Sequence, residues 1–140
     1  MTTVAYRDGI MASDSSCWEG STNAHSVKKI WKIRGCLVGC SGHLADINAF
    51  VRWIKDGAQE DDYPRMKDLS AIVVSHTGKV CCFESGSFHP IKVGGKYCAT
   101  GSGATVALGA MHHGATAVEA VRAARFHNEA TKGRIVTAKL

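Results

Sequence analysis

The second residue of the chain carries the groups of a self-contained nucleophile. If Met1 is removed, as the small side chain behind it favours, Thr2 becomes the amino terminus with a hydroxyl and a free amine on neighbouring carbons. A threonine hydroxyl is a weak nucleophile at neutral pH and needs a proton acceptor within hydrogen-bonding reach. The α-amine, with an ordinary pKa of about 7.7–8.0, can be that acceptor. We therefore predict an amino-terminal nucleophile at Thr2.

The residues that follow Thr2 predict a β-hairpin. Val4 and Tyr6 alternate with smaller residues, Asp8-Gly9 is a tight-turn dipeptide, and an apolar run over 10–12 follows it. Pairing in a sheet would hold the first residue rigidly, whereas most chain termini are loose. Taken alone, the hairpin favours the simpler interpretation, an ordinary edge strand that begins at Thr2.

Composition and charge indicate one globular domain that spans residues 1–140. Hydrophobic residues make up 45% and charged residues 21%, the balance of a soluble protein. The net charge is +5, but the basic residues are scattered along the sequence, so we expect no nucleic-acid binding. No apolar run approaches the roughly 20 residues of a membrane span, and the first residues do not resemble an export signal. We expect a cytoplasmic protein without membrane contact.

The cysteine and histidine pattern predicts no metal site. Cys81 and Cys82 are adjacent on an expected strand and would point to opposite faces, and His112-His113 would not share a helix face. Reduced thiols are expected for all six cysteines, which are Cys17, Cys36, Cys40, Cys81, Cys82 and Cys98. Gly101-Ser102-Gly103 lacks the third small residue of a nucleotide-binding turn, because Val106 stands there. We therefore expect no cofactor.

Hydrophobic periodicity predicts an α+β fold. The polar stretch Cys17 to Ser26 is expected to be a loop. Apolar spacing predicts a helix from Leu44 to near Gly57, and Thr116 is expected to cap a helix that ends near His127. A further helix is expected after Gly103, and strands are expected at 27–33, 36–39, 71–74, 80–83, 91–93, 97–100 and 134–138. The connection over 59–64 should be exposed.

Five segments, in the same order, resemble the proteasome β-subunit family, and most closely its bacterial HslV-type proteases. They are Thr2-Thr3-Val4 leading to Gly9-Ile10-Met11-Ala12-Ser13-Asp14, Val27-Lys28-Lys29-Ile30, Gly39-Cys40-Ser41-Gly42 with Ala45-Asp46, Gly101-Ser102-Gly103, and Glu129 to Gly133. The resemblance implies a four-layer αββα sandwich of antiparallel sheets, the N-terminal-nucleophile hydrolase fold. Only one helix is expected between Gly42 and Ala71, where the family has two. One outer helical layer should therefore be reduced.

The resemblance implies a lysine that tunes the nucleophile, and its counterpart here is Lys29. A nearby ammonium would lower the pKa of the Thr2 amine and favour the developing alkoxide. Lys28 should point to the other side of the strand. Asp14 matches the family aspartate that holds the lysine by a charge-assisted hydrogen bond. Without the resemblance, these residues could be solvated strand lysines and a turn aspartate.

Three further positions are implied by the same resemblance. Gly39 stands at the oxyanion position, where its backbone N–H would be the donor. Ser102 matches a serine that bonds near the threonine amine and helps relay its proton, although a helix cap is its ordinary role. Glu129 stands four residues before Gly133, where relatives carry an aspartate that supports the site; its side chain is longer.

The resemblance implies a threonine-type peptidase that acts on polypeptides within a homo-oligomeric ring. A separate unfolding ATPase could feed such a ring, because the sequence has no ATPase motif of its own. Two alternatives stay open. One is an amidase of the same fold that acts on a small molecule, and the other is a catalytically silent ring or scaffold subunit.

Overall fold

The amino-terminal hairpin predicted from alternation forms the middle of the first β-sheet. In the computed structural model, which describes residues 2–19, 22–128 and 131–140, β1 (Thr3–Arg7) pairs antiparallel with β2 (Ile10–Ser13). Asp8 and Gly9 both have positive φ, 51° and 79°, as the type I′ turn between twisted strands requires. The sheet has the order β10-β1-β2-β11, with β10 (Tyr97–Gly101) and β11 (Val136–Lys139) at its edges.

The second sheet is a continuous antiparallel ladder in the order β5-β6-β7-β8-β9. Its strands are β5 (Ile30–Ile33), β6 (Cys36–Gly42), β7 (Leu69–Val74), β8 (Val80–Glu84) and β9 (Ile91–Val93). The strands predicted from apolar runs are therefore confirmed, with small shifts of their ends. The last strand begins at Val136 rather than at Arg134.

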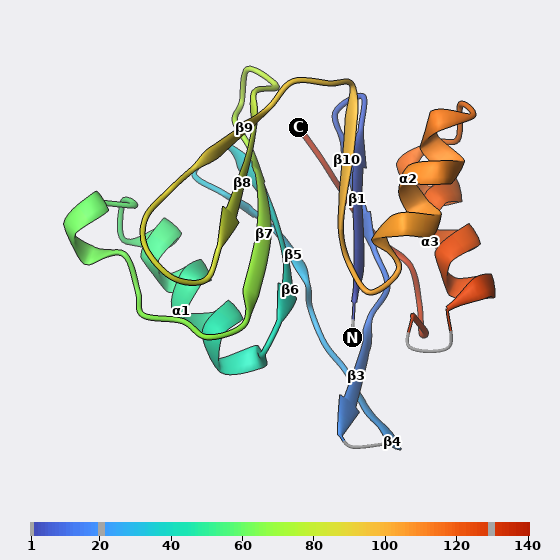
Figure 1. The fold of residues 1–140 in the computed structure, drawn as a ribbon, viewed down its shortest axis with the longest axis horizontal. Coiled ribbons are helices and arrows are strands. Elements are labelled where there is room, and N and C mark those ends of the chain that lie inside the picture. Colours follow the sequence, from blue (N-terminus) through green and yellow to red (C-terminus); the bar gives the residue numbers. More distant parts are fainter. Residues whose placement is uncertain (1, 20–21, 129–130) are drawn as a thin grey trace.

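Three helices cover the outer faces of the two sheets (Figure 1). The second sheet is covered by α1 (Leu44–Lys55), and the first by α2 (Ala104–His112) and α3 (Ala117–His127). The predicted cap of α3 is confirmed: the Thr116 side chain accepts the Glu119 N–H, and the Glu119 carboxylate accepts the Thr116 N–H. The layers are therefore helix, sheet, sheet and helix.

Apolar packing joins each pair of neighbouring layers. Between the sheets, Val4, Leu37 and Ile72 are completely buried. Phe50 of α1 packs into an aromatic cluster on the outer face of the second sheet, and Ala120 of α3 allows close contact with the first. Burial of this apolar surface is the main force that holds the layers together.

The helical layer over the second sheet is thin. Every residue from 42 to 71 is described, and this segment contains one α-helix, α1, and the short 3-10 helix η1 (Glu60–Asp62). The prediction of a single helix here is confirmed. The acidic side chains of η1 are exposed, as expected for a connection.

The prediction of a loop from Cys17 to Ser26 is wrong. Strands β3 (Ser16–Glu19) and β4 (Thr22–Ser26) pair antiparallel in this region. The hairpin extends beyond the edge of the sandwich (Figure 1), and its two strands pair through backbone hydrogen bonds. Its Ser-, Thr- and Asn-rich composition was therefore a poor guide to its secondary structure.

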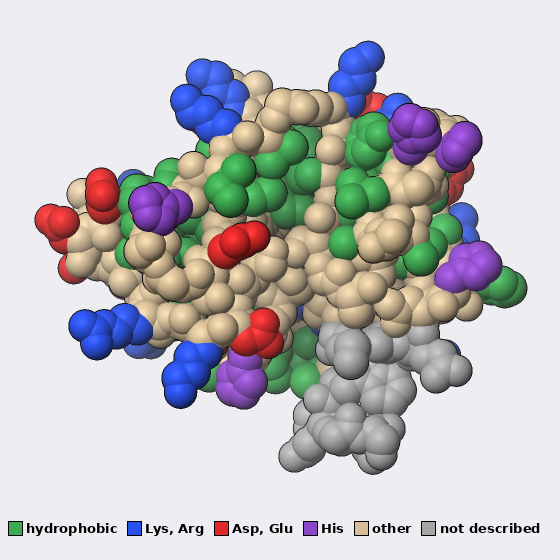
Figure 2. Space-filling model, viewed as in Figure 1, with side chains coloured by type: hydrophobic (Ala, Val, Ile, Leu, Met, Phe, Trp, Pro, Cys, Tyr) green, Lys and Arg blue, Asp and Glu red, His purple; other side chains and the backbone are tan. Residues whose placement is uncertain are grey.

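Charged side chains are dispersed over the face of the molecule in Figure 2. Lys and Arg side chains lie at separate positions around its margin and do not gather into one stripe. Among the described residues, no helix has an apolar stretch long enough to cross a bilayer.

Candidate active site

Thr2 lies at the start of β1, at one end of the space between the two sheets. Only 4% of its surface is exposed. Its carbonyl oxygen accepts a hydrogen bond from Ser102 Oγ at 3.4 Å. The pairing of Thr3 with Gly101 brings these segments together, and a side chain at Gly101 would collide with the Thr2 carbonyl. Thr2 is therefore held against the turn that precedes α2.

Asp14 is the centre of a buried hydrogen-bond network beside Thr2. The Lys29 ammonium donates to both Asp14 carboxylate oxygens, at 3.1 and 3.0 Å. The Thr3 N–H donates to Asp14 Oδ1 at 2.9 Å, and Ser16 Oγ donates to Oδ2 at 2.6 Å. Asp14 is completely buried, and its carboxylate also accepts the Lys132 N–H at 3.3 Å. These contacts hold the carboxylate and, through it, the ammonium in one position.

The Lys29 side chain is 3% exposed, which is unusual for a lysine. Burial lowers the pKa of Lys29 below its ordinary value of 10.5, because a charge loses its hydration in the interior. The charge and hydrogen bonds of Asp14 oppose that change. The neighbouring Lys28 is exposed, so the two lysines differ as predicted, although both precede β5, which begins at Ile30.

Thr2 and Lys29 line the same cavity, which has a volume of about 180 Å³. Its lining combines polar residues, which include Ser16, with apolar ones, which include Val27 and Ile47. The complete lining is Thr2, Ser16, Cys17, Val27, Lys29, Gly42, His43, Leu44 and Ile47. Gly42, His43 and Leu44 are exposed, so the cavity opens to solvent along the start of α1. The structure thus brings the predicted nucleophile and the predicted lysine to one solvent-accessible site.

The prediction that Gly39 supplies the oxyanion donor disagrees with the geometry. A Cβ at Gly39 would face Val4 and Met11 in the core. The Cys40 N–H donates to the Lys29 carbonyl, on the β5 side of β6, and successive N–H groups of a strand point in opposite directions. The Gly39 N–H is therefore directed at β7 and away from the cavity.

Gly42 is the glycine of this strand that lines the cavity. The His43 N–H donates to the Asp68 carbonyl at 3.0 Å, on the β7 side, so the Gly42 N–H points the other way. That direction is beyond the end of β5, whose first residue is Ile30. A Cβ at Gly42 would collide with the Asp68 carbonyl, and its φ of 122° favours glycine.

Of the two remaining predicted site residues, Ser102 lies at the site and Glu129 cannot be placed. Ser102 contacts the Thr2 carbonyl, while the N-cap position of α2 is Gly103, so a capping role for Ser102 is not observed. Glu129 lies outside the described residues.

Sequence reasoning missed two residues of the network, Ser16 and Thr131. Ser16 donates to Asp14, and the Thr131 hydroxyl lies 2.7 Å from the Thr3 hydroxyl. The position of Ser16 two residues after Asp14 was a usable signal, because a serine hydroxyl and an aspartate carboxylate so close in sequence often form a local hydrogen bond.

Comparison with known proteins supports the architecture. No protein-family model and no curated protein sequence matches this chain. Solved structures that match it include Thiobacillus denitrificans BPH in complex with epoxomicin, with a TM-score of 0.70, 15% identity, and coverage of 99% of this chain and 97% of the other. A second BPH structure from that organism has a TM-score of 0.67 and 18% identity, with 99% and 96% covered.

A eukaryotic HslV from Trypanosoma brucei matches with a TM-score of 0.70 and 16% identity, covering 99% of this chain and 98% of the other. At these identities the likeness concerns the fold. The order of layers, the antiparallel sheets and the nearly complete coverage agree with one another. This chain therefore has the αββα fold of the HslV-like N-terminal-nucleophile hydrolases, with one thin helical layer.

Proposed function

We propose that this chain is a threonine-type peptidase whose nucleophile is Thr2, exposed as the amino terminus when Met1 is removed. The observation that carries the proposal is the cavity lined by both Thr2 and Lys29, in which the ammonium is fixed by the completely buried Asp14. A buried ion pair is weak evidence for stability, so stability alone does not account for this cation. Beside a threonine hydroxyl, a cation can stabilise the alkoxide and lower the pKa of the adjacent amine.

The proposed reaction begins when the Thr2 hydroxyl attacks a peptide carbonyl and its proton passes to the Thr2 amine. The Lys29 ammonium lowers the pKa of that amine by charge repulsion, which increases its neutral, proton-accepting fraction; each pKa unit corresponds to about 1.36 kcal/mol. The same positive charge stabilises the developing alkoxide. Asp14 acts as a positioning residue, because it holds Lys29 rather than the substrate.

The Gly42 N–H is the proposed donor to the oxygen of the tetrahedral intermediate. It replaces Gly39 in this role because it lines the cavity and points away from β7. Collapse of the intermediate passes the proton from the Thr2 amine to the leaving nitrogen, and water then hydrolyses the ester to Thr2. Ser102, in contact with the Thr2 carbonyl, steadies the nucleophile, and a supporting role for Glu129 belongs to the same proposal.

The proposed substrates are polypeptides, processed in the cytoplasm by a homo-oligomeric ring formed from this single-domain chain. The likeness to an HslV fold supports the ring, and light scattering on the purified protein measures its size. An unfolding ATPase would be a separate protein. If so, the isolated ring should cut short peptides and leave a stably folded protein intact until that ATPase is added.

Turnover of fluorogenic peptides by matched variants tests the proposed chemistry. Thr2→Ala should abolish cleavage, and Thr2→Ser should retain part of it, because serine keeps the hydroxyl beside the amine. Thr105→Ala is the control, since Thr105 is exposed on α2 away from the cavity. Epoxomicin, which is bound in the BPH complex, serves as an independent probe and should react with wild type and not with Thr2→Ala.

Other outcomes would identify the alternatives. Hydrolysis of small amides without any cleavage of peptides would indicate an amidase of the same fold. Retention of Met1 in the native protein, together with no turnover, would indicate a silent ring subunit. Either result would contradict the proposed peptidase.

A further inference from the structure

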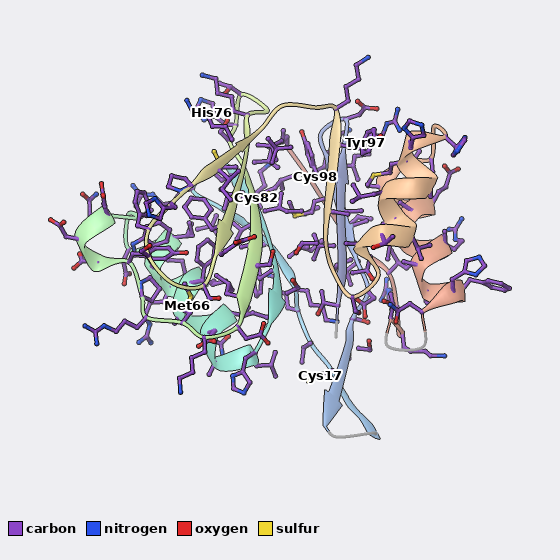
Figure 3. All side chains as sticks on the ribbon, viewed as in Figure 1. Cys17, Met66, His76, Cys82, Tyr97 and Cys98 are labelled. Atoms are coloured by element: carbon purple, nitrogen blue, oxygen red, sulfur yellow. The ribbon has the colours of Figure 1, made fainter. Side chains whose placement is uncertain are left out.

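Cys17 lines the Thr2 cavity but has no part in the proposed reaction. Its side chain is half-buried, and it comes from β3, at the base of the hairpin that extends beyond the sandwich (Figure 3). A thiol in this position meets any molecule that enters the cavity. The thiol is partly exposed, and Leu44, which lines the same cavity, is exposed.

The cavity has a second sign of a ligand site. The Thr2 side chain lines it, although only 4% of this residue is exposed, and no described residue forms a hydrogen bond with the Thr2 hydroxyl. Buried polar groups normally have partners within the protein. The Thr2 hydroxyl is not among the fully buried atoms that lack a partner, so it is open to the cavity, where an entering molecule can bind it next to Cys17.

Lys29 adds a positive charge to the lining of the same cavity. A negative charge on Cys17 is among the influences that raise the pKa of Lys29, so the thiol and the ammonium lie within electrostatic range. The thiolate is the reactive form of cysteine. Both residues line the cavity, so a thiolate formed at Cys17 would share it with the Lys29 ammonium.

The other cysteines differ from Cys17 in burial or in position. Burial raises the pKa of Cys98 to about 12, and it also raises the pKa values of Cys40 and Cys82. Cys82 and Cys98 lie on β8 and β10, far from the position of Cys17 on β3 (Figure 3). Cys36 and Cys81 are half-buried and outside the Thr2 cavity. They are matched control thiols.

We propose that Cys17 is a modification site that closes the Thr2 cavity reversibly. A small disulfide enters, the Cys17 thiol loses its proton to solvent, and the thiolate attacks one sulfur. The S–S bond of the small molecule breaks, a mixed disulfide forms on Cys17, and the other half leaves as a thiolate that takes up a proton. No further oxidant is needed, and an excess of free thiol reverses the exchange.

The size of the cavity explains why such an adduct would block substrate. A cavity of about 150 Å³ in another protein holds a benzene ring, and the Thr2 cavity has about 180 Å³. A few added atoms on Cys17 therefore fill much of the space beside the nucleophile. The loss of turnover depends on the proposed peptidase function, whereas the reactivity of Cys17 does not.

Treatment of the assembled protein with bis(2-hydroxyethyl) disulfide tests the proposal. Peptide mapping by mass spectrometry measures labelling of each cysteine, and peptide turnover is followed in parallel. Cys17 should react at least about tenfold faster than Cys82 and Cys98, turnover should fall in proportion to its labelling, and dithiothreitol should restore both. Cys17→Ser should resist the reagent, while the Cys36→Ser/Cys81→Ser double variant should remain sensitive.

A variant at the cavity opening gives a readout that needs no enzyme activity. Leu44→Trp should narrow the opening and slow labelling of Cys17, with labelling of Cys36 unchanged. An unreactive Cys17 beside readily labelled Cys36 and Cys81 would overturn the proposal, as would full labelling of Cys17 with unchanged turnover. If untreated wild type shows no turnover, the peptidase proposal fails, and the labelling rates still decide the site at Cys17.

Discussion

The space between the two sheets has an apolar part and a polar part that are built from the same strands. Along β1, Val4 and Tyr6 face an apolar core that includes Leu37 and Ile72. At the start of that strand the interior changes to the ion pair of Asp14 and Lys29 beside Thr2. The apolar part gains free energy from burial, whereas the polar part requires two charges to leave water.

This contrast separates what stabilises the fold from what the site needs. Replacing a buried ion pair with packed apolar residues is often neutral or stabilising, so the fold does not require charges at this position. The proposed reaction would account for their presence beside a threonine and an open cavity. The apolar part should therefore control stability alone, and the polar part should control turnover as well.

The largest effect is expected from Lys29→Met, which leaves the Asp14 carboxylate buried without its cation. The free energy of unfolding should fall by about 3–5 kcal/mol, and peptide turnover should be lost even in the folded fraction. Urea titration and an assay at low temperature measure the two effects. Lys28→Met is the matched control, because Lys28 is exposed, and it should change neither quantity appreciably.

Gly42→Ala should slow the chemical step, because a Cβ there would meet the Asp68 carbonyl and shift the cavity-facing N–H. Loss of such a donor raises the barrier by about 2.7–4 kcal/mol, seen as a lower kcat. Gly39→Ala should instead reduce stability, since its Cβ would meet Val4 and Met11 in the core. A normal kcat for Gly42→Ala beside a low kcat for folded Gly39→Ala would restore Gly39 as the donor.

A smaller effect is expected from Ile72→Val in the apolar part. Removal of one buried methylene group should lower the free energy of unfolding by about 0.5–1.5 kcal/mol. Turnover per folded molecule should stay unchanged, because Ile72 does not line the cavity. A marked loss of turnover in this variant would break the proposed separation between the two parts.

The smallest expected effect is a change in the free energy of unfolding with pH that arises from the titration of Lys29. Because burial lowers its pKa below 10.5 in the folded state, the unfolded chain binds more protons between the two pKa values, and stability from this group rises with pH in that interval. The free energy of unfolding of wild type minus that of Lys29→Met should therefore increase as the pH rises toward the ordinary lysine pKa of 10.5. A decrease would mean that Asp14 raises the lysine pKa more than burial lowers it.

Sequence patterns predicted most of the fold because the packed layers leave periodic apolar residues in each element. The spacing of Ile47 and Phe50 follows from the one apolar face of α1. Strand β1 is buried on both faces, with Val4 toward the second sheet and Ala5 toward the helices. The β3–β4 hairpin was missed because its pairing rests on backbone hydrogen bonds, which leave little trace in composition.

The candidate site was predictable where a residue's role depends on its type, and less so where it depends on backbone direction. Thr2, Asp14 and Lys29 carry distinctive groups, and the structure brings them together. The donor glycine depends on which way an N–H points within β6, and Gly39 and Gly42 differ in that respect although both are glycines. Strand register, which needs long-range pairing, decides between them.

The intact mass of the native protein, before and after incubation with a threonine-directed covalent inhibitor, tests the central claim most directly. The account predicts a chain that lacks Met1 and gains one inhibitor molecule, attached at Thr2, with no gain in Thr2→Ala. A native chain that keeps Met1, or an inhibitor attached elsewhere while Thr2 stays free, would contradict it.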